Sequence, residues 1–257
     1  MSSSAAPDAV LPSESVVLEG PLLVLVAMPE EAAPLTARLE AAQQLETPFA
    51  VGVAATRGTL AGTDAVVVTT GIGIAAASAA ATWAILTTSP GLVVAAGSCG
   101  GLAADVEVGT LIVGETFTYS IADATAFGYA PGQVPGGPER FTARAAWVDA
   151  AEQAALRAEA RSGGHGVRRG LMLSGDAFVT AEIAAPMRER FPAALSADME
   201  TTASARTAEA LGVPFVALRA VSDLCGPAAG QQFHLELEVV AETSAAAVEQ
   251  LAGARPL

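Results

Sequence analysis

The sequence of 257 residues contains no lysine, so all 13 of its permanently positive side chains are arginines. Without lysine, the protein cannot form a lysine Schiff base or the lysine contact of a P-loop. Long apolar runs are missing too, because none reaches the roughly 18 residues that a membrane-spanning helix needs. The 27 acidic residues give a formal net charge of −14, which repels nucleic acids and anionic membranes. We therefore expect a protein that binds neither nucleic acid nor membrane.

Cysteine and histidine are also scarce, with two of each. The spacing of Cys99, Cys225, His165 and His234 matches no set of metal ligands and no disulfide framework. We therefore expect no metal ion and no cofactor. A reducing, cytoplasmic compartment is the default expectation for such a chain.

The two ends of the chain differ in composition from the rest. Residues 1–20 are rich in Ser, Ala, Pro and acids but lack the basic and apolar regions of a signal peptide, so we expect a disordered tail. Residues 253–257 are expected to form a second short tail. Between them, residues 21–252 contain no repeat or linker, and α/β folds reach this size as a single domain.

Apolar runs typical of buried strands alternate with helical patterns over residues 21–252. Strands are predicted at 22–27, 64–69, 91–96, 106–113, around Phe117, and at 170–173, 193–197 and 213–218, with a hairpin-like segment at 50–60. Helices are predicted at 29–42, 75–86, 145–160, 181–190, 201–211 and 235–251. This order favours a single-domain, three-layer α/β/α fold with a central mixed, twisted β-sheet.

The most informative segment is the apolar strand at 213–218 together with the residues after it, which end in Ser222 and Asp223. In open α/β sheets, ligands bind at the carboxyl ends of the strands. A carboxylate placed there by a buried strand is expected to have a raised pKa and to donate a proton near neutral pH. Alternatively, Ser222 or Asp223 is the N-cap of the next helix. The segment alone favours neither interpretation.

Five other polar or glycine-rich segments also follow predicted strands: 28–31, 71–73, 97–101, 174–178 and 198–200. Glycine at such places lets the backbone approach a ligand closely. The segment 71–73 matches part of a dinucleotide-binding fingerprint, but it lacks the third glycine and a convincing acidic partner for a ribose. We therefore regard a dinucleotide cofactor as a poorly supported interpretation of this segment.

Seven short stretches occur together in an order that chance does not explain: Ala27–Glu31, Gly97–Gly101, Asp123–Tyr129, Gly132–Gly136, Ser174–Phe178, Asp198–Glu200 and Arg219–Asp223. In these stretches the chain resembles the bacterial 5′-methylthioadenosine/S-adenosylhomocysteine nucleosidases, members of the nucleoside phosphorylase superfamily, over about residues 22–251. The resemblance implies a hydrolase that cleaves the N-glycosidic bond of these two nucleosides, with 5′-deoxyadenosine as a further candidate, and releases adenine. It also implies a place in methionine salvage and nucleoside catabolism.

The resemblance further implies roles for individual residues, because the bond breaks through an oxocarbenium-like transition state. Asp223 matches the general acid at N7 of adenine, and Ser222 matches the residue that orients it. Glu31 matches the carboxylate that positions and activates the attacking water. Ser98 and Arg219 match further groups around that water and carboxylate.

The remaining matches concern substrate binding. Glu200 matches the acceptor of the ribose 2′ and 3′ hydroxyls, with Met199 beneath the sugar. Phe178 is expected against the base, the Val179 backbone at its edge, and Met28, Ile72 and Phe233 around the sugar and the 5′ group. Ala124, Phe127 and Pro135 match positions that reach into a neighbouring subunit's pocket, which implies a homodimer.

Several of these residues also have ordinary structural explanations. Glu30 and Glu31 are typical first-turn acids of a helix, and without the other motifs that explanation is the better one. Met28 and Met199 are typical core residues.

Water and phosphate are both nucleophiles compatible with this fold. A phosphorylase needs arginines for a phosphate dianion, and the related phosphorylases have one three positions before the serine of Gly-Ser-Cys-Gly, where this chain has Ala95. Glu31 would also repel phosphate, although the spelling Gly-Ser-Cys-Gly itself is closer to the phosphorylases. We therefore predict a hydrolase, with a phosphorylase and a non-catalytic nucleoside-binding protein as alternatives.

Two departures from the family pattern leave the preferred 5′ group open. Asp198 stands where the family usually has Glu, and the segment 224–230 is atypical. Related nucleosidases that act on 6-amino-6-deoxyfutalosine or adenosyl-hopane keep a similar core, so these substrates remain alternatives. The loop at 125–129 favours methylthioadenosine and adenosylhomocysteine.

Overall fold

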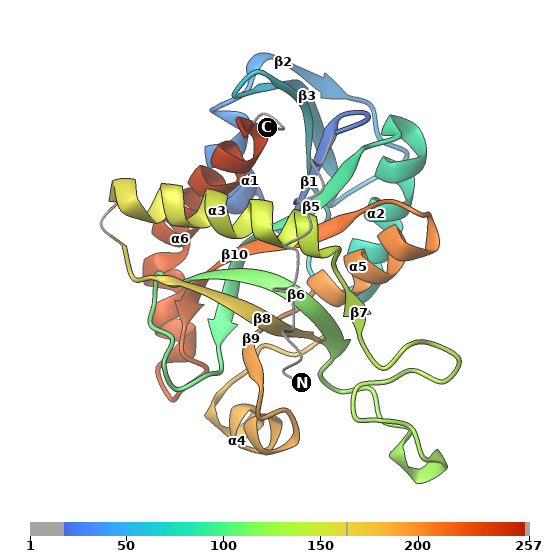
Figure 1. The fold of residues 1–257 in the computed structure, drawn as a ribbon, viewed down its shortest axis with the longest axis vertical. Helices are drawn as coiled ribbons and strands as arrows, with labels where there is room; N and C mark the ends of the chain where they lie inside the picture. Colours follow the sequence, from blue (N-terminus) through green and yellow to red (C-terminus); the bar gives the residue numbers. More distant parts are fainter. Residues whose placement is uncertain (1–17, 163, 255–257) are drawn as a thin grey trace, which may run out of the picture.

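Apolar strands form the middle of one mixed ten-stranded sheet in the computed structural model, which describes residues 18–162 and 164–254 (Figure 1). β1 (Leu22–Val26) lies between β4 (Thr63–Thr69) and β5 (Leu92–Gly101), and all three strands are parallel. Strands in this position are covered on both faces, which explains their continuous apolar runs. Most of both predicted tails, residues 1–17 and 255–257, lies outside the described part of the chain.

Five strands of the sheet close into a ring, which the sequence pattern did not predict. The ring runs from β5 to β10 (Phe215–Asp223), β6 (Leu111–Tyr119), β8 (Val167–Ser174), β9 (Ala194–Asp198) and back to β5. β9 is antiparallel to β5 and pairs only with Gly100 and Gly101, while β10 pairs with β5 as far as Gly100. The carboxyl ends of β5, β9 and β10 therefore meet at one place.

The opposite edge of the sheet is formed by an antiparallel extension. β3 (Ala54–Leu60) pairs with β4, and β2 (Glu40–Leu45) pairs with β3. The short strand β7 (Phe141–Thr142) pairs with β6. Parallel and antiparallel pairs thus occur in the same sheet, as predicted.

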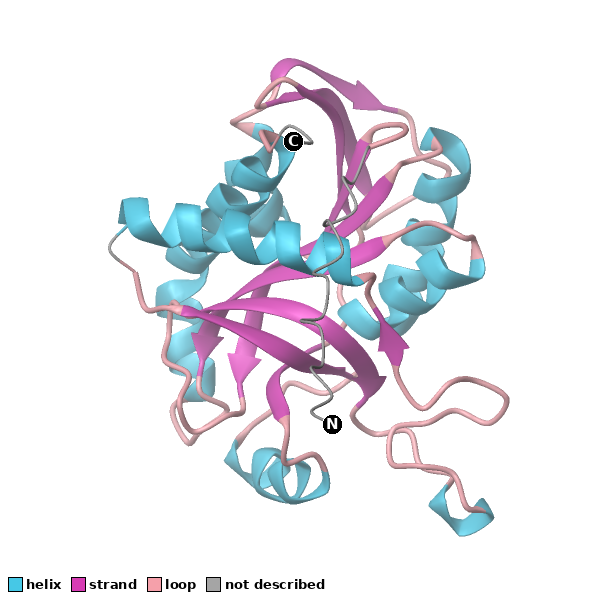
Figure 2. Cartoon of the chain, in the orientation of Figure 1, coloured by secondary structure: helices cyan, strands magenta, loops and turns pink. Residues whose placement is uncertain are grey.

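Helices lie on both sides of the sheet (Figure 2). α1 (Pro29–Thr36) and α3 (Ala145–Ser162) pack against α6 (Ala229–Ala252), which in turn contacts β5 and β10. α2 (Ile74–Thr88) and α5 (Thr201–Ala210) pack against each other, and α4 (Ala181–Arg190) lies in the connection between β8 and β9. The predicted α/β fold with a central mixed sheet is confirmed.

The structure corrects several predicted element boundaries. The helix predicted over 29–42 ends at Thr36, and Glu40–Leu45 forms β2 instead. These six residues are almost all exposed, so they have no apolar face for a packed helix, whereas β3 offers unpaired backbone groups. The strand predicted over 106–113 begins at Leu111, because the preceding residues form a turn in which Gly109 has φ +91°. Segment 97–101 belongs to β5, and α6 begins six residues before the predicted position.

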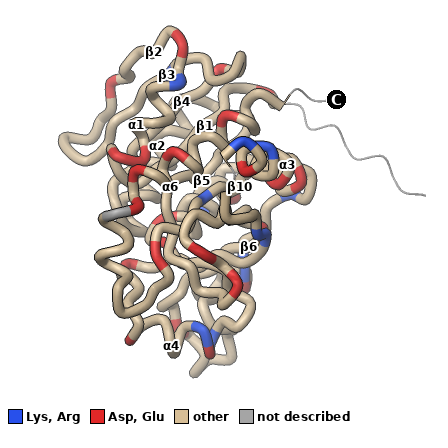
Figure 3. Tube along the Cα trace, turned by 90° about the vertical axis from the view of Figure 1, so that its left-hand side faces the viewer, with Lys and Arg blue, Asp and Glu red and all other residues tan. Residues whose placement is uncertain are grey.

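Acidic residues outnumber basic ones by 27 to 13 in the sequence, and the backbone view shows where they lie. Acidic residues occur on elements throughout the view in Figure 3, and arginines at fewer places. None of the helices in the described ranges has both the length and the apolar character needed to cross a membrane.

Candidate active site

A pocket of about 290 Å³ lies where the carboxyl ends of β5, β9 and β10 meet the start of α1 and the first turns of α6. Every residue that the sequence predicted for the chain's own site lines this pocket: Met28, Glu31, Ile72, Ser98, Phe178, Val179, Met199, Glu200, Arg219, Ser222, Asp223 and Phe233. These residues come from segments far apart in the sequence. The fold therefore brings the whole predicted set together.

Glu31 is buried at the start of α1, and each oxygen of its carboxylate accepts two hydrogen bonds. Oε2 accepts the backbone N–H groups of Ala27 at 2.8 Å and Met28 at 3.2 Å. Oε1 accepts the backbone N–H and the hydroxyl of Ser98, both at 2.8 Å. The first pair of hydrogen bonds caps the start of α1, as acids in a first helical turn commonly do. The second pair joins the start of this helix to β5. Glu31 therefore stabilises its helix and is also fixed beside the pocket.

Glu200 and Arg219 form a buried ion pair next to this carboxylate. Arg219 donates from Nη2 to Oε2 of Glu200 at 3.3 Å and from Nη1 to the carbonyl oxygen of Ser98 at 2.7 Å. The other oxygen of Glu200 accepts the backbone N–H of Gly73 at 3.0 Å. Burial raises the pKa of Glu200 to about 7, although the positive charge of Arg219 opposes the rise. Burial therefore favours the protonated form of Glu200, and Arg219 favours its carboxylate.

Asp198 fixes the backbone at Glu200 through hydrogen bonds. Its Oδ1 accepts hydrogen bonds from the Ser174 hydroxyl at 2.8 Å and from the backbone N–H groups of Glu200 and Thr201 at 2.9 and 2.8 Å. Its Oδ2 is 3.7 Å from Nε of Arg219, which is too long for a hydrogen bond. Asp198 thus holds the start of α5 and also lies within ion-pair distance of Arg219.

Asp223 ends β10 and lines the pocket. Its Oδ2 accepts the Ser222 hydroxyl at 3.0 Å, and its Oδ1 accepts the backbone N–H of Cys225 at 3.0 Å. Burial raises its pKa, and these hydrogen bonds oppose the rise. The alternative of a helix N-cap is wrong, because the next helix begins at Ala229 and its N-cap is Ala228.

Aromatic and aliphatic side chains form the rest of the lining. Phe178, in the β8–α4 connection, and Phe233, in α6, meet edge to face with their ring centroids 5.7 Å apart. Phe178 is 42% exposed and Ile72 is 55% exposed, so both have a large surface available for contact, whereas Val179 is buried. The pocket therefore has one charged side and one apolar side.

The three residues predicted to serve a neighbouring subunit lie outside this chain's own pocket. They belong to the long connection between β6 and β7, which extends away from the sheet and contains the short helix η1 (Thr125–Phe127) (Figure 1). Phe127 is 83% exposed and Pro135 is exposed, whereas Ala124 is already buried within its own chain. Phe127 is therefore the more exposed of the two large apolar side chains that this loop presents, the other being Ile121 at 58%.

Sequence reasoning missed several residues of the lining. Cys99 and Cys225 both line the pocket, but burial raises the pKa of each thiol, that of Cys225 to about 12, so both stay neutral and are poor nucleophiles. The backbone contact of Gly73 with Glu200 was missed as well. The only sequence signals were the glycine-rich turn at 71–73 and the position of Cys225 two residues after Asp223.

The pocket lining contains four carboxylates, those of Glu31, Asp198, Glu200 and Asp223, and a single positive charge. Arg219 is the one cationic side chain among the described residues that line the pocket, and it already binds Glu200 and a backbone carbonyl. Such a site can give a proton from Asp223, hold a neutral nucleophile near Glu31 and accept hydroxyl groups at Glu200. It is poorly suited to a phosphate dianion.

Comparisons with known proteins agree with this geometry. The sequence profile of the Phosphorylase superfamily matches residues 21–254. A 5′-methylthioadenosine/S-adenosylhomocysteine nucleosidase of Geobacillus kaustophilus is 38% identical over 223 residues, which cover 86% of this chain and 92% of that protein.

Two solved structures are also similar. One is the 5′-methylthioadenosine/S-adenosylhomocysteine nucleosidase of Neisseria meningitidis in complex with methylthio-immucillin-A, with 34% identity, a TM-score of 0.84, and coverage of 91% of this chain and 99% of the other. The second is the corresponding nucleosidase of Colwellia psychrerythraea in complex with adenine, with 33% identity, a TM-score of 0.86, and coverage of 91% and 95%.

Proposed function

The chain belongs to the phosphorylase superfamily and, within it, to the 5′-methylthioadenosine/S-adenosylhomocysteine nucleosidases, and we propose that its pocket performs their reaction as follows. The protein is a hydrolase of N-glycosidic bonds that converts 5′-methylthioadenosine and S-adenosylhomocysteine to adenine and the 5′-substituted ribose. One observation carries the proposal: Asp223, Glu31 and Glu200 line the same small pocket although they lie far apart in the sequence.

In the proposed mechanism, Asp223 is the general acid. Adenine is a poor leaving group as an anion, and a proton placed on its N7 lets it depart neutral. The raised pKa of Asp223 keeps the proton available, and the Ser222 hydroxyl and the Cys225 N–H stabilise the carboxylate that remains. Phe178 and Phe233 bind the base and the 5′ side of the sugar on the apolar side of the pocket.

Glu31 positions the attacking water on the other side of the scissile bond. Three of the four protein donors around its carboxylate are backbone N–H groups in fixed positions, and the fourth is the Ser98 hydroxyl. The Ser98 hydroxyl is the only donor there that can rotate, so it is the group that exchanges its place on Oε1 with water. Glu31 then accepts the proton that the water loses as it bonds to the anomeric carbon.

Glu200 binds the ribose in this scheme. Two ribose hydroxyls donating to its carboxylate favour the ionised form of Glu200. The resulting negative charge lies beside the sugar as positive charge develops on it, which stabilises an oxocarbenium-like transition state. Arg219 keeps the carboxylate in place.

Water rather than phosphate is the proposed nucleophile. Ala95 is buried in β5 and does not line the pocket, so nothing at that position binds an anion. The space beside Glu31 is bounded by a carboxylate, which repels phosphate. A phosphorylase is therefore the less favoured alternative.

We further propose that the active form is a cytoplasmic homodimer that acts in methionine salvage. The exposed Phe127 and the extended loop that carries it support the dimer, because a large apolar side chain that is 83% exposed is typical of an interface. In this arrangement Phe127 and Pro135 enclose the 5′ group in the partner's pocket. Ala124 is buried in its own chain and contributes there through the loop's conformation.

The proposal is tested by incubating the protein with 5′-methylthioadenosine in phosphate-free buffer. We expect free adenine and 5-methylthioribose at a rate that added phosphate does not increase. Strict dependence on phosphate, with a ribose-1-phosphate product, would instead establish a phosphorylase. Tight binding of the nucleoside without any adenine release would establish a binding protein.

A panel of nucleosides that differ at the 5′ position then defines the substrate. The panel contains S-adenosylhomocysteine, 5′-deoxyadenosine, 6-amino-6-deoxyfutalosine and adenosyl-hopane beside methylthioadenosine. We expect the highest kcat/KM for methylthioadenosine or adenosylhomocysteine.

A further inference from the structure

Asp176 is part of the stretch Ser174–Phe178, but it has no role in the proposed mechanism. It follows β8, is exposed, and does not line the pocket. The three residues after it, Ala177, Phe178 and Val179, all line the pocket, on the side where the base is proposed to bind. Asp176 is therefore the last residue before the base-binding wall.

The carboxylate of Asp176 bonds to a segment 102 residues away in the sequence. Its Oδ1 accepts the backbone N–H of Ile74 at 2.7 Å, at the first residue of α2. α2 has no side-chain cap of its own, since its N-cap is Gly73. A carboxylate at this end of the helix satisfies an otherwise unpaired N–H and interacts favourably with the helix dipole.

The segment that Asp176 holds belongs to the ribose side of the pocket. Gly73 donates its N–H to Glu200 at 3.0 Å, and Ile72 lines the pocket. Gly73 also lies against Asp176 itself, because a Cβ at position 73 would be 2.8 Å from Oδ1 of Asp176, and its φ is +102°. The two segments thus approach each other as closely as a glycine allows.

We propose that Asp176 is a positioning residue that holds the base-binding segment 177–179 against the ribose-binding segment 72–74, so that the two halves of the nucleoside are bound by one wall of fixed geometry. The proposal rests on the proposed function, because it assigns base and ribose to these two segments. Asp176 acts through backbone contacts and touches neither half of the substrate.

Two substitutions separate the hydrogen bond from the charge. Asp176→Asn keeps an oxygen that can accept the Ile74 N–H, so we expect kcat/KM for methylthioadenosine within about threefold of the wild-type value. Asp176→Ala removes the acceptor, and we expect kcat/KM to fall by between about tenfold and a hundredfold, with KM raised. Asp64→Ala is the matched control, since Asp64 is an exposed aspartate that binds Arg57 on the far strands β3 and β4, and we expect it to have no effect.

Binding of the two products tests the positioning role without turnover. In the wild-type protein we expect saturating 5-methylthioribose to lower the Kd for adenine, and in Asp176→Ala we expect this coupling to shrink towards none. If Asp176→Ala retains wild-type KM and full coupling, or if wild-type protein shows no coupling, the proposal is overturned. If its activity falls only in proportion to its folded fraction, with coupling intact, the residue is merely structural and the proposal is again overturned. Failure of the proposed function is distinct, because wild-type protein would then release no adenine.

Discussion

Gly97 and Glu31 are in such close contact that no side chain fits at position 97. A Cβ built there would lie 2.5 Å from the carboxyl carbon of Glu31. Gly97 also has φ +110°, a backbone conformation that residues other than glycine rarely adopt. The backbone of Gly97 thus packs directly against the buried carboxylate of Glu31. Its N–H in turn is held by the Ser244 hydroxyl at 2.9 Å.

Gly97→Ala should therefore displace Glu31 and abolish most activity. We expect kcat/KM to fall by more than about 100-fold and the free energy of unfolding to fall by about 2 kcal/mol or more, because the methyl group collides with a carboxylate that cannot move freely. Gly212→Ala is the control: its φ is +73°, but nothing lies within 4 Å of an added Cβ. The control should lose about 1 kcal/mol through backbone strain and keep full activity. Equal activity losses in the two variants would contradict the explanation.

Asp223→Asn should remove the proton donor without unfolding the protein. We expect kcat to fall by about 10² to 10⁴-fold, with thermal unfolding close to that of the wild type, because the amide still fits the pocket but does not protonate adenine. In the wild-type enzyme, kcat/KM should decline as pH rises through the raised pKa of Asp223, since the acid loses its proton. Kinetic profiles between pH 5 and 10 check this, and a rate that increases steadily with pH would exclude Asp223 as the acid.

Glu200→Gln should change how stability depends on pH. The pKa of Glu200 is raised from 4.5 to about 7 in the folded protein, so its protonated form is favoured by folding. Its contribution to stability is fully present below pH 4.5 and is lost as pH rises through about 7. The Tm of the wild type minus that of Glu200→Gln should therefore decrease as pH rises from 4.5 to about 7 and stay constant above that pH. A relative Tm that rises over this range would mean that Arg219 outweighs burial.

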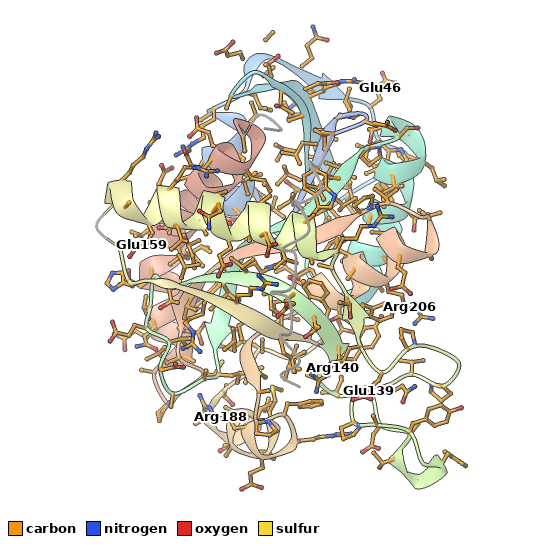
Figure 4. The ribbon with its side chains drawn as sticks, in the orientation of Figure 1. Glu46, Glu139, Arg140, Glu159, Arg188 and Arg206 are labelled. Carbon is orange, nitrogen blue, oxygen red and sulfur yellow. The ribbon has the colours of Figure 1, made fainter. Side chains whose placement is uncertain are left out.

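Arg188→Ala should loosen the turn that follows Asp223, the proposed general acid. Arg188, on α4, donates from Nε to the carbonyl oxygen of Leu102 at 2.8 Å and from Nη2 to that of Leu224 at 3.1 Å, directly after Asp223 (Figure 4). We expect kcat to fall by about tenfold or more with a smaller change in KM, because the acid is misaligned while the ribose side is untouched. Arg206→Ala, on α5, removes an exposed arginine elsewhere and should be neutral. Identical kinetics of the two variants would exclude this role.

Much of the fold was predictable because the strands of the central sheet are buried on both faces. Continuous apolar runs such as Leu22–Val26 can hardly be anything other than strands in a protein of this composition. Glu40–Leu45 was predicted wrongly because its residues are exposed, so no apolar pattern records that they pair with β3. Edge strands are specified by the neighbour's free backbone groups more than by their own side chains.

For the site, the sequence by itself determined which side chains are available: Asp223, Glu31 and Glu200 at strand ends, and no lysine for other chemistry. It left Asp223 balanced between a helix cap and an acid, and it left Glu31 with an ordinary first-turn explanation. Only the tertiary structure excluded the cap, since the next helix begins at Ala229, and only the ring of β5, β10, β6, β8 and β9 buries these carboxylates in the same pocket. The physical reason is that a pKa and a hydrogen-bond network depend on neighbours in space, and the neighbours of Glu31 and Asp176 come from positions 67 and 102 residues away.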